Sequence, residues 1–405
     1  MMAEANAALE TGSEVAETIG EQTPSRRTFL TGVGAAGVAA VGGCLGSLSG
    51  GDGGGPETVT FGTLTIPAVA EVLIANDRGY FEERDISLDI KRIQSAPKAT
   101  PQLASGKLDV ATGGIGASLF NSVAGDVDVR LVADQTQYWP GQPSGNRIWA
   151  RTAAVPDTDS IYELPEGLTI ALHGAGNVDS YIWGRILALN DMTWDDVDTK
   201  EILYTNMPVT MAEGEIDACA IPDPLGLQVA RKAEATQLGY ASMVAPRMQI
   251  AGYLFGGPFA KDRPDVASRW LEAYLKGVRE YYELGGFPSD EVARIVSDEF
   301  GLPKGVIKAS VPSLPHKNGR VNEDSVANQQ EFYACRGNVE EKVPTEDVID
   351  ESFLEDALNE VGALDPEDAR PTVQTILQWS ENAPRPYPPV GKIRPPNEFP
   401  MDSTC

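Results

Sequence analysis

Two glycine-rich stretches of the sequence carry residue types that can bind a small anion. The candidate ligand-binding residues in them are Gly114, Gly116, Ser118, Gly174, Asn177 and Ser180. Each stretch precedes an apolar run with helical spacing, so each is expected to begin a helix. The N-terminus of a helix exposes free N–H groups and the positive end of the helix dipole, which together favour an anion. Simple capping of the two helices is the alternative interpretation.

The second stretch also contains a residue that works against an anion. Asn177 can cap the helix and Ser180 falls in its first turn, but Asp179 adds a negative charge at the same place. This charge opposes a bound anion, and it could instead pair with a cationic or amino group of a solute. His173 just before the stretch is either a proton-handling group or, more simply, a hydrogen-bonded loop residue.

Further candidate ligand contacts come from three other places. Thr65 and Pro67 follow the first predicted strand, and Asp223 follows a later one. Gln135, Tyr138 and Trp139 lie in an irregular bridge, where they could line the mouth of a site. Structural alternatives stand beside these roles, because Pro67 can begin a helix, Trp139 can pack in a core, and Asp223 can cap the next helix.

Strands that alternate with helices must position these residues. Two rounds of the pattern are visible, one from Glu57 to about Ala150 and one after it, in which residues 201–206 (EILYTN) have the composition of a strand. Such alternation predicts an α/β fold with mostly parallel sheets. In open sheets of this kind ligands bind beyond the C-terminal ends of the strands, where both glycine-rich stretches fall.

Two segments of the chain have nearly the same short sequence pattern. Residues 103–111 read LASGKLDVA, and residues 211–219 read MAEGEIDAC. Each copy is expected to be the end of a helix, a glycine cap and the entry to a parallel strand. Two copies in matching order predict two comparable sheets facing one another across a cleft. The alternative is that the phrase is only a common way to connect a helix to a strand.

Composition limits the classes of protein that the chain can belong to. A length of 405 residues with 42% hydrophobic residues is enough for two lobes with real cores. The 32 basic and 59 acidic residues give a formal net charge of −27, which disfavours nucleic acid and anionic lipid as partners. The acidic surface suits very salty surroundings, and docking of a basic partner is the alternative.

The N-terminal region has the features of an export signal. Arg26 and Arg27 precede a weakly apolar run of residues 28–43, which is too short to span about 30 Å of hydrocarbon. This pattern is typical of twin-arginine signals, so residues 1–44 are expected to be a lipoprotein signal. Cys44 after VGG is the expected lipid attachment site, although it could be an ordinary residue of a cleaved peptide.

An exported lipoprotein would also need a tether after its signal, and it could contain a disulfide. Residues 45–56 are rich in Gly and Ser and form the expected flexible tether, and residues 382–405 form a Pro-rich tail. The protein is therefore expected to be exported and anchored to the outer face of the membrane. Outside the cell a disulfide is possible, and Cys335 with Cys405 is the plausible pair.

The phrases LASGKLDVATGG, MAEGEIDACAIPDP and PFAKDRPDVASRWLEAYLKGV, in this order, resemble the substrate-binding proteins of ABC importers for nitrate, sulfonates, taurine and bicarbonate. The resemblance implies a two-lobed, periplasmic-binding-protein-like fold of type II with two hinge crossovers. Lobe 1 would comprise residues 57–150 and 251–381, and lobe 2 residues 151–250. One departure is that this family usually has a hydroxyl residue after the glycine of the second loop, whereas Ala175 follows Gly174 here.

The resemblance also implies a function. The chain would be a monomeric solute-binding component that delivers a small anion or organic molecule to an ABC permease, with no enzymatic activity, no cofactor and no metal. Two alternatives share the same fold, an exported enzyme and a receptor for a thiamine-precursor pyrimidine. Fold alone does not decide between them.

Overall fold

Ten strands form two five-stranded sheets in the computed structural model, which describes residues 55–93, 98–140 and 142–371. The described residues from Pro56 onward belong to one compact unit. We call the first sheet with its helices lobe 1 and the second sheet with its helices lobe 2. The predicted signal (residues 1–44), the predicted tail (residues 382–405), Cys44 and Cys405 lie outside the described residues, as does most of the predicted tether.

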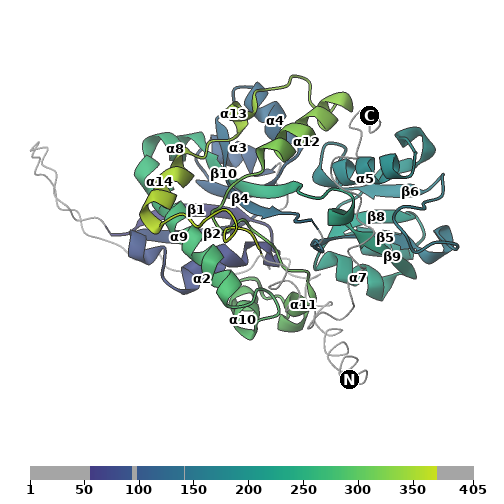
Figure 1. Ribbon diagram of the computed structural model, residues 1–405, viewed down its shortest axis with the longest axis horizontal. Helices are drawn as coiled ribbons and strands as arrows, with labels where there is room; N and C mark the ends of the chain where they lie inside the picture. Colours follow the sequence, from purple (N-terminus) through teal and green to yellow (C-terminus); the bar gives the residue numbers. More distant parts are fainter. Residues whose placement is uncertain (1–54, 94–97, 141, 372–405) are drawn as a thin grey trace, which may run out of the picture. The chain divides into compact units, whose positions relative to one another are not determined.

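The first sheet has the strand order β2-β1-β3-β10-β4 (Figure 1). Its strands are β1 (Glu57–Thr63), β2 (Ile86–Arg92), β3 (Val110–Gly114), β4 (Val129–Gln137) and β10 (Gln249–Gly256). The helices among these strands are η1 (Pro67–Val69), α2 (Ala70–Asp77), η2 (Glu82–Arg84), α3 (Thr100–Ala104) and α4 (Ala117–Ala124). The helices after β10 are α8 (Gly257–Asp262), α9 (Pro264–Glu283), α10 (Asp290–Phe300), α11 (Lys304–Ala309), α12 (Glu323–Cys335), α13 (Thr345–Val348) and α14 (Ser352–Val361).

The second sheet repeats this arrangement with the order β7-β6-β8-β5-β9. Its strands are β5 (Asn146–Arg151), β6 (Thr169–Leu172), β7 (Asp198–Glu201), β8 (Ala218–Pro222) and β9 (Ala235–Tyr240). Its helices are η4 (Thr152–Ala154), α5 (Val178–Leu189), η5 (Trp194–Asp196), α6 (Met207–Ala212), α7 (Leu225–Lys232) and η6 (Ala241–Met243). In both sheets the third strand in the order is the one entered through the repeated phrase.

The expected α/β fold with two sheets is confirmed, but the sheets are mixed rather than mostly parallel. β1 runs parallel to β2 and β3, and β6 runs parallel to β7 and β8. The strands β10 and β5 run antiparallel to both of their neighbours. The chain crosses between the sheets twice, from β4 to β5 and from β9 to β10. The strand that follows each crossing, β5 or β10, runs antiparallel to its neighbours in the sheet that it joins.

The placement of β5 differs from the boundary expected between the lobes. The sequence interpretation ended the first part of lobe 1 at residue 150, yet β5 at residues 146–151 is a central strand of the second sheet. The crossover is therefore the segment 138–145, ahead of that boundary. The second crossover, residues 244–248, precedes β10 and lies close to the expected boundary at 251.

A second difference concerns the edge strand of lobe 2. The sequence predicted a strand over residues 201–206, but β7 spans Asp198–Glu201 and its four residues are exposed. Charged residues are common on edge strands because they discourage pairing with another chain. The more apolar residues that follow, Ile202 to Tyr204, instead form the turn that leads to α6.

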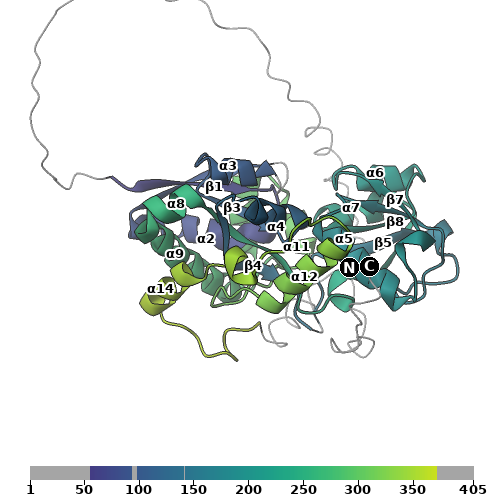
Figure 2. The ribbon, with the colours of Figure 1, turned by 90° about the horizontal axis from the view of Figure 1, so that it is seen from above.

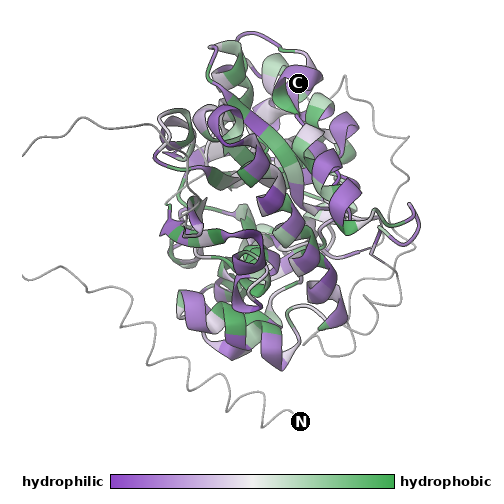
Figure 3. Cartoon of the chain, turned by 90° about the vertical axis from the view of Figure 1, so that its left-hand side faces the viewer, coloured by the Kyte–Doolittle hydropathy of each residue, from purple (hydrophilic) through white to green (hydrophobic). Residues whose placement is uncertain are grey.

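Buried apolar side chains fill both lobes. In lobe 1 a cluster of aromatic rings includes Tyr253 on β10 and Trp270 and Tyr274 on α9, all fully buried. A second cluster continues from lobe 1, with Ile115 and Phe120, into lobe 2. Figure 3 colours each residue by hydropathy, with green (hydrophobic) stretches along strands and purple (hydrophilic) stretches on many helices. In the described part of the chain, every helix is too short or too polar to cross a membrane.

The repeated phrase has the same structural role in both copies. Gly106 and Gly214 each end a helix with φ values of 68° and 75°, a conformation that favours glycine. Asp109 accepts a hydrogen bond from the Thr60 N–H of β1, and Asp217 accepts one from the Thr169 N–H of β6. The phrase therefore fastens each helix-to-strand connection to the neighbouring parallel strand. It lies at the start of the strand, away from the edge where ligands are expected.

Candidate ligand-binding seam between the lobes

The two glycine-rich loops face one another and touch directly. Gly116 begins α4 and Asn177 begins α5, so the N-termini of both helices lie at this contact. The Ala117 N–H donates to the Gly176 carbonyl oxygen over 2.8 Å. A Cβ atom on Gly116 would lie 2.9 Å from that same oxygen, which explains why glycine is required there. We call the contact between residues 114–118 and 174–180, together with the side chains around it, the seam.

Helix α12 covers one side of the seam and contacts both lobes (Figures 1 and 2). The Tyr333 hydroxyl donates to the Ile115 carbonyl oxygen over 3.1 Å. The neighbouring Phe332 ring packs edge-on against Tyr181 of α5, with the ring centroids 5.3 Å apart. Phe332 also lies against Gly184, where a Cβ atom would be 2.5 Å from the ring. Helix α12 thus seals the seam with aromatic side chains.

Asp179 lies in the first turn of α5 with no exposed surface. One of its oxygens, Oδ2, accepts a hydrogen bond from the backbone N–H of His173, while Oδ1 is buried without a hydrogen-bond partner. Burial raises the pKa of the Asp179 carboxyl from 3.8 to about 7, because removal from water disfavours the charged form. Asp179 is therefore a buried acid with one oxygen available to a donor.

Two tyrosine hydroxyls share this environment. The hydroxyls of Tyr204 and Tyr138 are both buried and form no hydrogen bond, although the Ser144 side chain lies near that of Tyr138. Burial raises the pKa of Tyr204 well above 10, and the charges of Asp179 and Tyr138 raise it further. The Tyr204 hydroxyl is thus coupled electrostatically to Asp179 and, separately, to Tyr138.

His173 holds Tyr204 in place. The two rings stack with their centroids 4.1 Å apart and their planes 9° apart, and the Tyr204 N–H donates to His173 Nδ1 over 3.2 Å. Burial lowers the pKa of His173, so the neutral form that accepts this hydrogen bond is favoured. His173 is thus the hydrogen-bonded loop residue that the simpler interpretation of the sequence described.

The predicted Asn177 cap of α5 is present, whereas α4 begins at Gly116 without a side-chain cap. The Asn177 side chain accepts a hydrogen bond from the Val178 N–H over 2.8 Å, and the Ser180 hydroxyl donates to the Asn177 carbonyl oxygen over 2.7 Å. Both polar side chains are therefore engaged within the loop. Gly174 lies two residues before the close contact at Gly176 and has open space around its Cβ position. The ligand roles predicted for these residues remain predictions.

Four other candidates lie in lobe 1 or its crossover. Pro67 is buried at the first position of η1, as its structural alternative predicted, while Thr65 is exposed. The Gln135 side chain donates to the Ala68 carbonyl oxygen. Trp139 Nε1 donates to the Leu314 carbonyl oxygen over 2.8 Å, so this ring packs against the C-terminal part of lobe 1. None of these contacts connects the four residues to Asp179.

Asp223 neither caps α7 nor lies free at the end of β8. Its carboxylate forms two hydrogen bonds with the Arg147 guanidinium, of 2.8 and 2.9 Å, and accepts a third from the Val311 N–H at 2.9 Å. Burial raises the pKa of Asp223 and the charge of Arg147 opposes that rise. Because Val311 belongs to lobe 1, its hydrogen bond to Asp223 links the two lobes, while the ion pair with Arg147 lies within lobe 2.

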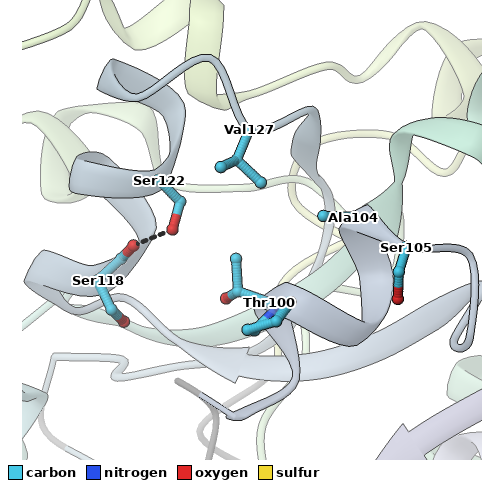
Figure 4. A pocket seen from close by; sticks show the side chains of 7 residues that line it. Thr100, Ala104, Ser105, Ser118, Ser122 and Val127 are labelled. Carbon is cyan, nitrogen blue, oxygen red and sulfur yellow. Dashed lines mark hydrogen bonds between the residues drawn. The ribbon is translucent and has the colours of Figure 1, made fainter.

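A cavity of about 490 Å³ lies elsewhere, between α3 and α4 of lobe 1 (Figure 4). Ser118 is the one predicted site residue on its wall, and the hydroxyl of Ser122 there donates to the Ser118 carbonyl oxygen over 2.7 Å. The full lining is Thr100, Pro101, Ala104, Ser105, Ser118, Ser122 and Val127. These groups are small hydroxyl and apolar side chains without a charge, so the cavity offers less specific chemistry than the seam.

The last predicted sites concern the cysteines and possible metal ligands. Cys335 forms a disulfide, but Cys405, its predicted partner, lies outside the described residues, so that pairing stays a prediction. Cys44, the predicted lipid attachment site, lies outside them too. Within residues 55–93, 98–140 and 142–371, no group of three or more His, Cys, Asp or Glu side chains is placed to hold a metal ion.

Comparison with known proteins agrees with this architecture. Residues 52–247 match the model of the NMT1-like family. The matched part covers the first four strands of lobe 1, the first crossover and every strand and helix of lobe 2, so it includes both loops of the seam. This match, together with the relatives described next, confirms the resemblance expected from the sequence phrases.

Individual relatives are distant in sequence and similar in fold. The chain is 22% identical over 308 residues to a protein of Bacillus subtilis (strain 168) named for binding aliphatic sulfonates, covering 72% of this chain and 86% of that protein. A ligand-binding component of an ABC-type import system from Staphylococcus aureus superposes with a TM-score of 0.61 at 13% identity, covering 74% of this chain and 99% of that one. The aliphatic sulphonate-binding protein SsuA of Escherichia coli gives 0.58 at 18% identity, covering 74% and 99%.

An enzyme also shares this fold. The desulfurization enzyme DszB superposes with a TM-score of 0.52 at 15% identity, covering 75% of this chain and 99% of that chain. The relatives just described are named for binding, whereas this one is named for catalysis. The two-lobed scaffold therefore supports both kinds of function.

Tyr204 is the seam residue whose role the sequence did not predict, because it was assigned to a strand. Asp179 was treated both as an obstacle to an anion and as a possible partner for an amino group. The signal in the sequence was an aromatic residue shortly after the exposed edge strand β7, and the fold stacks it on the histidine that follows the neighbouring strand β6.

Proposed function

We propose that this protein is the extracytoplasmic solute-binding component of an ABC importer, and that it binds a small solute of the nitrate, sulfonate and taurine class at the seam. One observation carries the proposal. Asp179, Tyr204 and Tyr138 present polar atoms that are buried without hydrogen-bond partners where the two lobes meet. Buried polar groups are normally paired, so unpaired atoms in such a place suit a solute that supplies the partners.

The mechanism follows from the two crossovers. The segments 138–145 and 244–248 join the two lobes, so a hinge motion in them would open the seam. A solute that contacts both lobes binds the closed form more tightly and shifts the population towards it. The permease would then receive the closed, loaded form. Release of the solute follows when the seam contacts between the loops are broken.

The same proposal covers location. Residues 1–44 would direct export and Cys44 would carry a lipid, so that residues 45–56 tether the protein to the outer face of the membrane. The net charge of −27 would keep the protein dispersed in very salty surroundings. We expect a monomer.

Thermal stabilisation by solutes tests the proposal. The purified protein is heated with nitrate, taurine, alkanesulfonates, bicarbonate and hydroxymethylpyrimidine in turn, each with a salt control of equal ionic strength. A solute at a hundredfold excess over its Kd stabilises the folded form by about 2.7 kcal/mol, which raises Tm. We expect at least one solute to do so and to be recovered unchanged. If none of them raises Tm, the proposal fails.

A second candidate function is an enzyme, because DszB carries the same fold. The same experiment separates the two functions. Chemical analysis of the incubated solutes measures turnover, and consumption of any of them by the pure protein would favour the enzyme over the receptor.

A further inference from the structure

We infer that the solute carries an N–H donor, such as a protonated amine, and that Asp179 Oδ1 in the seam accepts it. This inference deepens the proposed function and rests on it. It separates amine-bearing solutes from simple oxyanions such as nitrate or an alkanesulfonate, which present only acceptors.

The N-terminus of α5 is already occupied by a negative group from the chain itself. Asp179 lies in the first turn, and its Oδ2 accepts the backbone N–H of His173. The adjacent Val178 N–H is bound by the Asn177 side chain. An oxyanion approaching this terminus would therefore meet a carboxylate and engaged N–H groups, whereas a cation or a neutral N–H donor would meet a free acceptor.

The free acceptor is costly unless the solute pairs with it. Oδ1 of Asp179 is buried without a hydrogen-bond partner on a side chain with 0% exposure. Leaving a buried polar atom unpaired costs more than an ordinary hydrogen bond contributes. A donor from the solute removes that cost, and a charged donor forms the stronger, charge-assisted bond.

The surrounding groups suit the rest of such a solute. The hydroxyls of Tyr204 and Tyr138 are also buried and unpaired, and a hydroxyl can donate to an oxygen or accept from a nitrogen. Tyr204 is held by its stack on His173, and its hydroxyl is coupled to Asp179. A small zwitterion could therefore place its amine on Asp179 and its acidic oxygens on the tyrosine hydroxyls.

Matched pairs of solutes test this inference without any mutation. Titration calorimetry compares taurine with ethanesulfonate, homotaurine with propanesulfonate, and β-alanine with propionate, where each pair differs only in the amine. We expect one amine-bearing member to bind about tenfold to a hundredfold more tightly than its partner, as a charge-assisted hydrogen bond predicts.

Variants then assign the effect to the seam. Asp179→Asn keeps the shape but replaces an acceptor with an amide, so the preference for the amine should fall to less than about threefold. Glu71→Gln is the matched control, since Glu71 is an equally buried acid in lobe 1, bonded to Tyr253. It should leave the preference unchanged. Tm is measured for each variant to confirm folding.

The outcomes of the inference and of the proposed function can be told apart. Equal or tighter binding of ethanesulfonate, propanesulfonate or nitrate by the wild-type protein overturns the inference and leaves the receptor function standing. A preference for the amine that persists in a folded Asp179→Asn variant also overturns the assignment to Asp179. Absence of binding by every solute, with or without an amine, contradicts the receptor function itself.

Discussion

Gly277 lies where helices α9 and α2 of lobe 1 come closest. A Cβ atom there would be 2.1 Å from the Glu71 carbonyl oxygen and 2.9 Å from the Ala75 Cβ. Gly277→Ala should therefore lower the free energy of unfolding by about 1–3 kcal/mol, because the two backbones must move apart. Urea denaturation measures the change.

Gly305 in α11 is the matched control for this prediction. It also lies in a helix, but its Cβ position has open space. Gly305→Ala should raise the free energy of unfolding by up to about 1 kcal/mol, because alanine is the better helix former. Equal effects of the two substitutions would show that helix propensity, rather than the contact between α9 and α2, governs Gly277.

Single residues differ in how far the sequence foretold their roles. The Asn177 cap and the start of η1 at Pro67 depend on neighbours along the chain, and both were predictable. The pairing of Asp223 with Arg147 joins residues 76 positions apart, so it depends on the alignment of β8 with β5. The local sequence pattern around either residue cannot predict such a contact.

At the scale of elements, Glu71 couples α2 to β10 and makes stability depend on pH. The Tyr253 hydroxyl donates to Glu71 Oε1 over 2.6 Å, and burial raises the pKa of Glu71 from 4.5 to about 8. Between these values the folded form holds a proton that the unfolded form has lost. The free energy of unfolding should therefore fall as pH rises from about 4.5 to 8, by at most about 1.4 kcal/mol per pH unit from this group.

Glu71→Gln tests this dependence because an amide does not titrate. Urea denaturation between pH 5 and 8 should show a shallower loss of stability in this variant than in the wild type. Some slope remains, since burial also raises the pKa of Asp134, to about 7. Tyr253→Phe keeps the acid and should keep the steeper slope. An unchanged slope in Glu71→Gln would contradict the prediction.

Most elements were predictable from periodicity, and the exception is instructive. Strands such as β1 and β6 are half-buried or buried, so their composition reveals them. The edge strand β7 is exposed and polar, and its pairing with β6 sets its position rather than its own side chains. The apolar residues after β7 have the composition of a strand, so Tyr204 was assigned to a strand and was not included in the predicted site.

At the scale of the whole molecule, the order of elements predicted two lobes but not how closely they meet. The sequence placed both glycine-rich loops at the ligand edge, and the structure brings them into direct contact at Ala117 and Gly176. The mixed sheets follow from the two crossovers, which no local pattern reveals. The functional chemistry then depends on side chains buried by that contact, so it could be found only in three dimensions.

The contact between the loops can be changed without altering any polar group. A Cβ atom on Gly176 would lie 2.6 Å from the Ala117 Cβ, across the seam. Alanine has no flexible end that could move aside, so Gly176→Ala must push the lobes apart. We expect it to lower Tm and to weaken binding of the best solute by about tenfold or more, because that solute must then bridge a wider gap.

Gly174→Ala is the control on the same loop, since open space surrounds the Cβ position of Gly174. It should change neither Tm nor affinity appreciably. Thermal denaturation and titration calorimetry on both variants make the comparison. If Gly176→Ala bound the solute as tightly as Gly174→Ala, the close approach of the two loops would have no part in holding it. The solute would then have to bind away from the seam, for example in the cavity between α3 and α4.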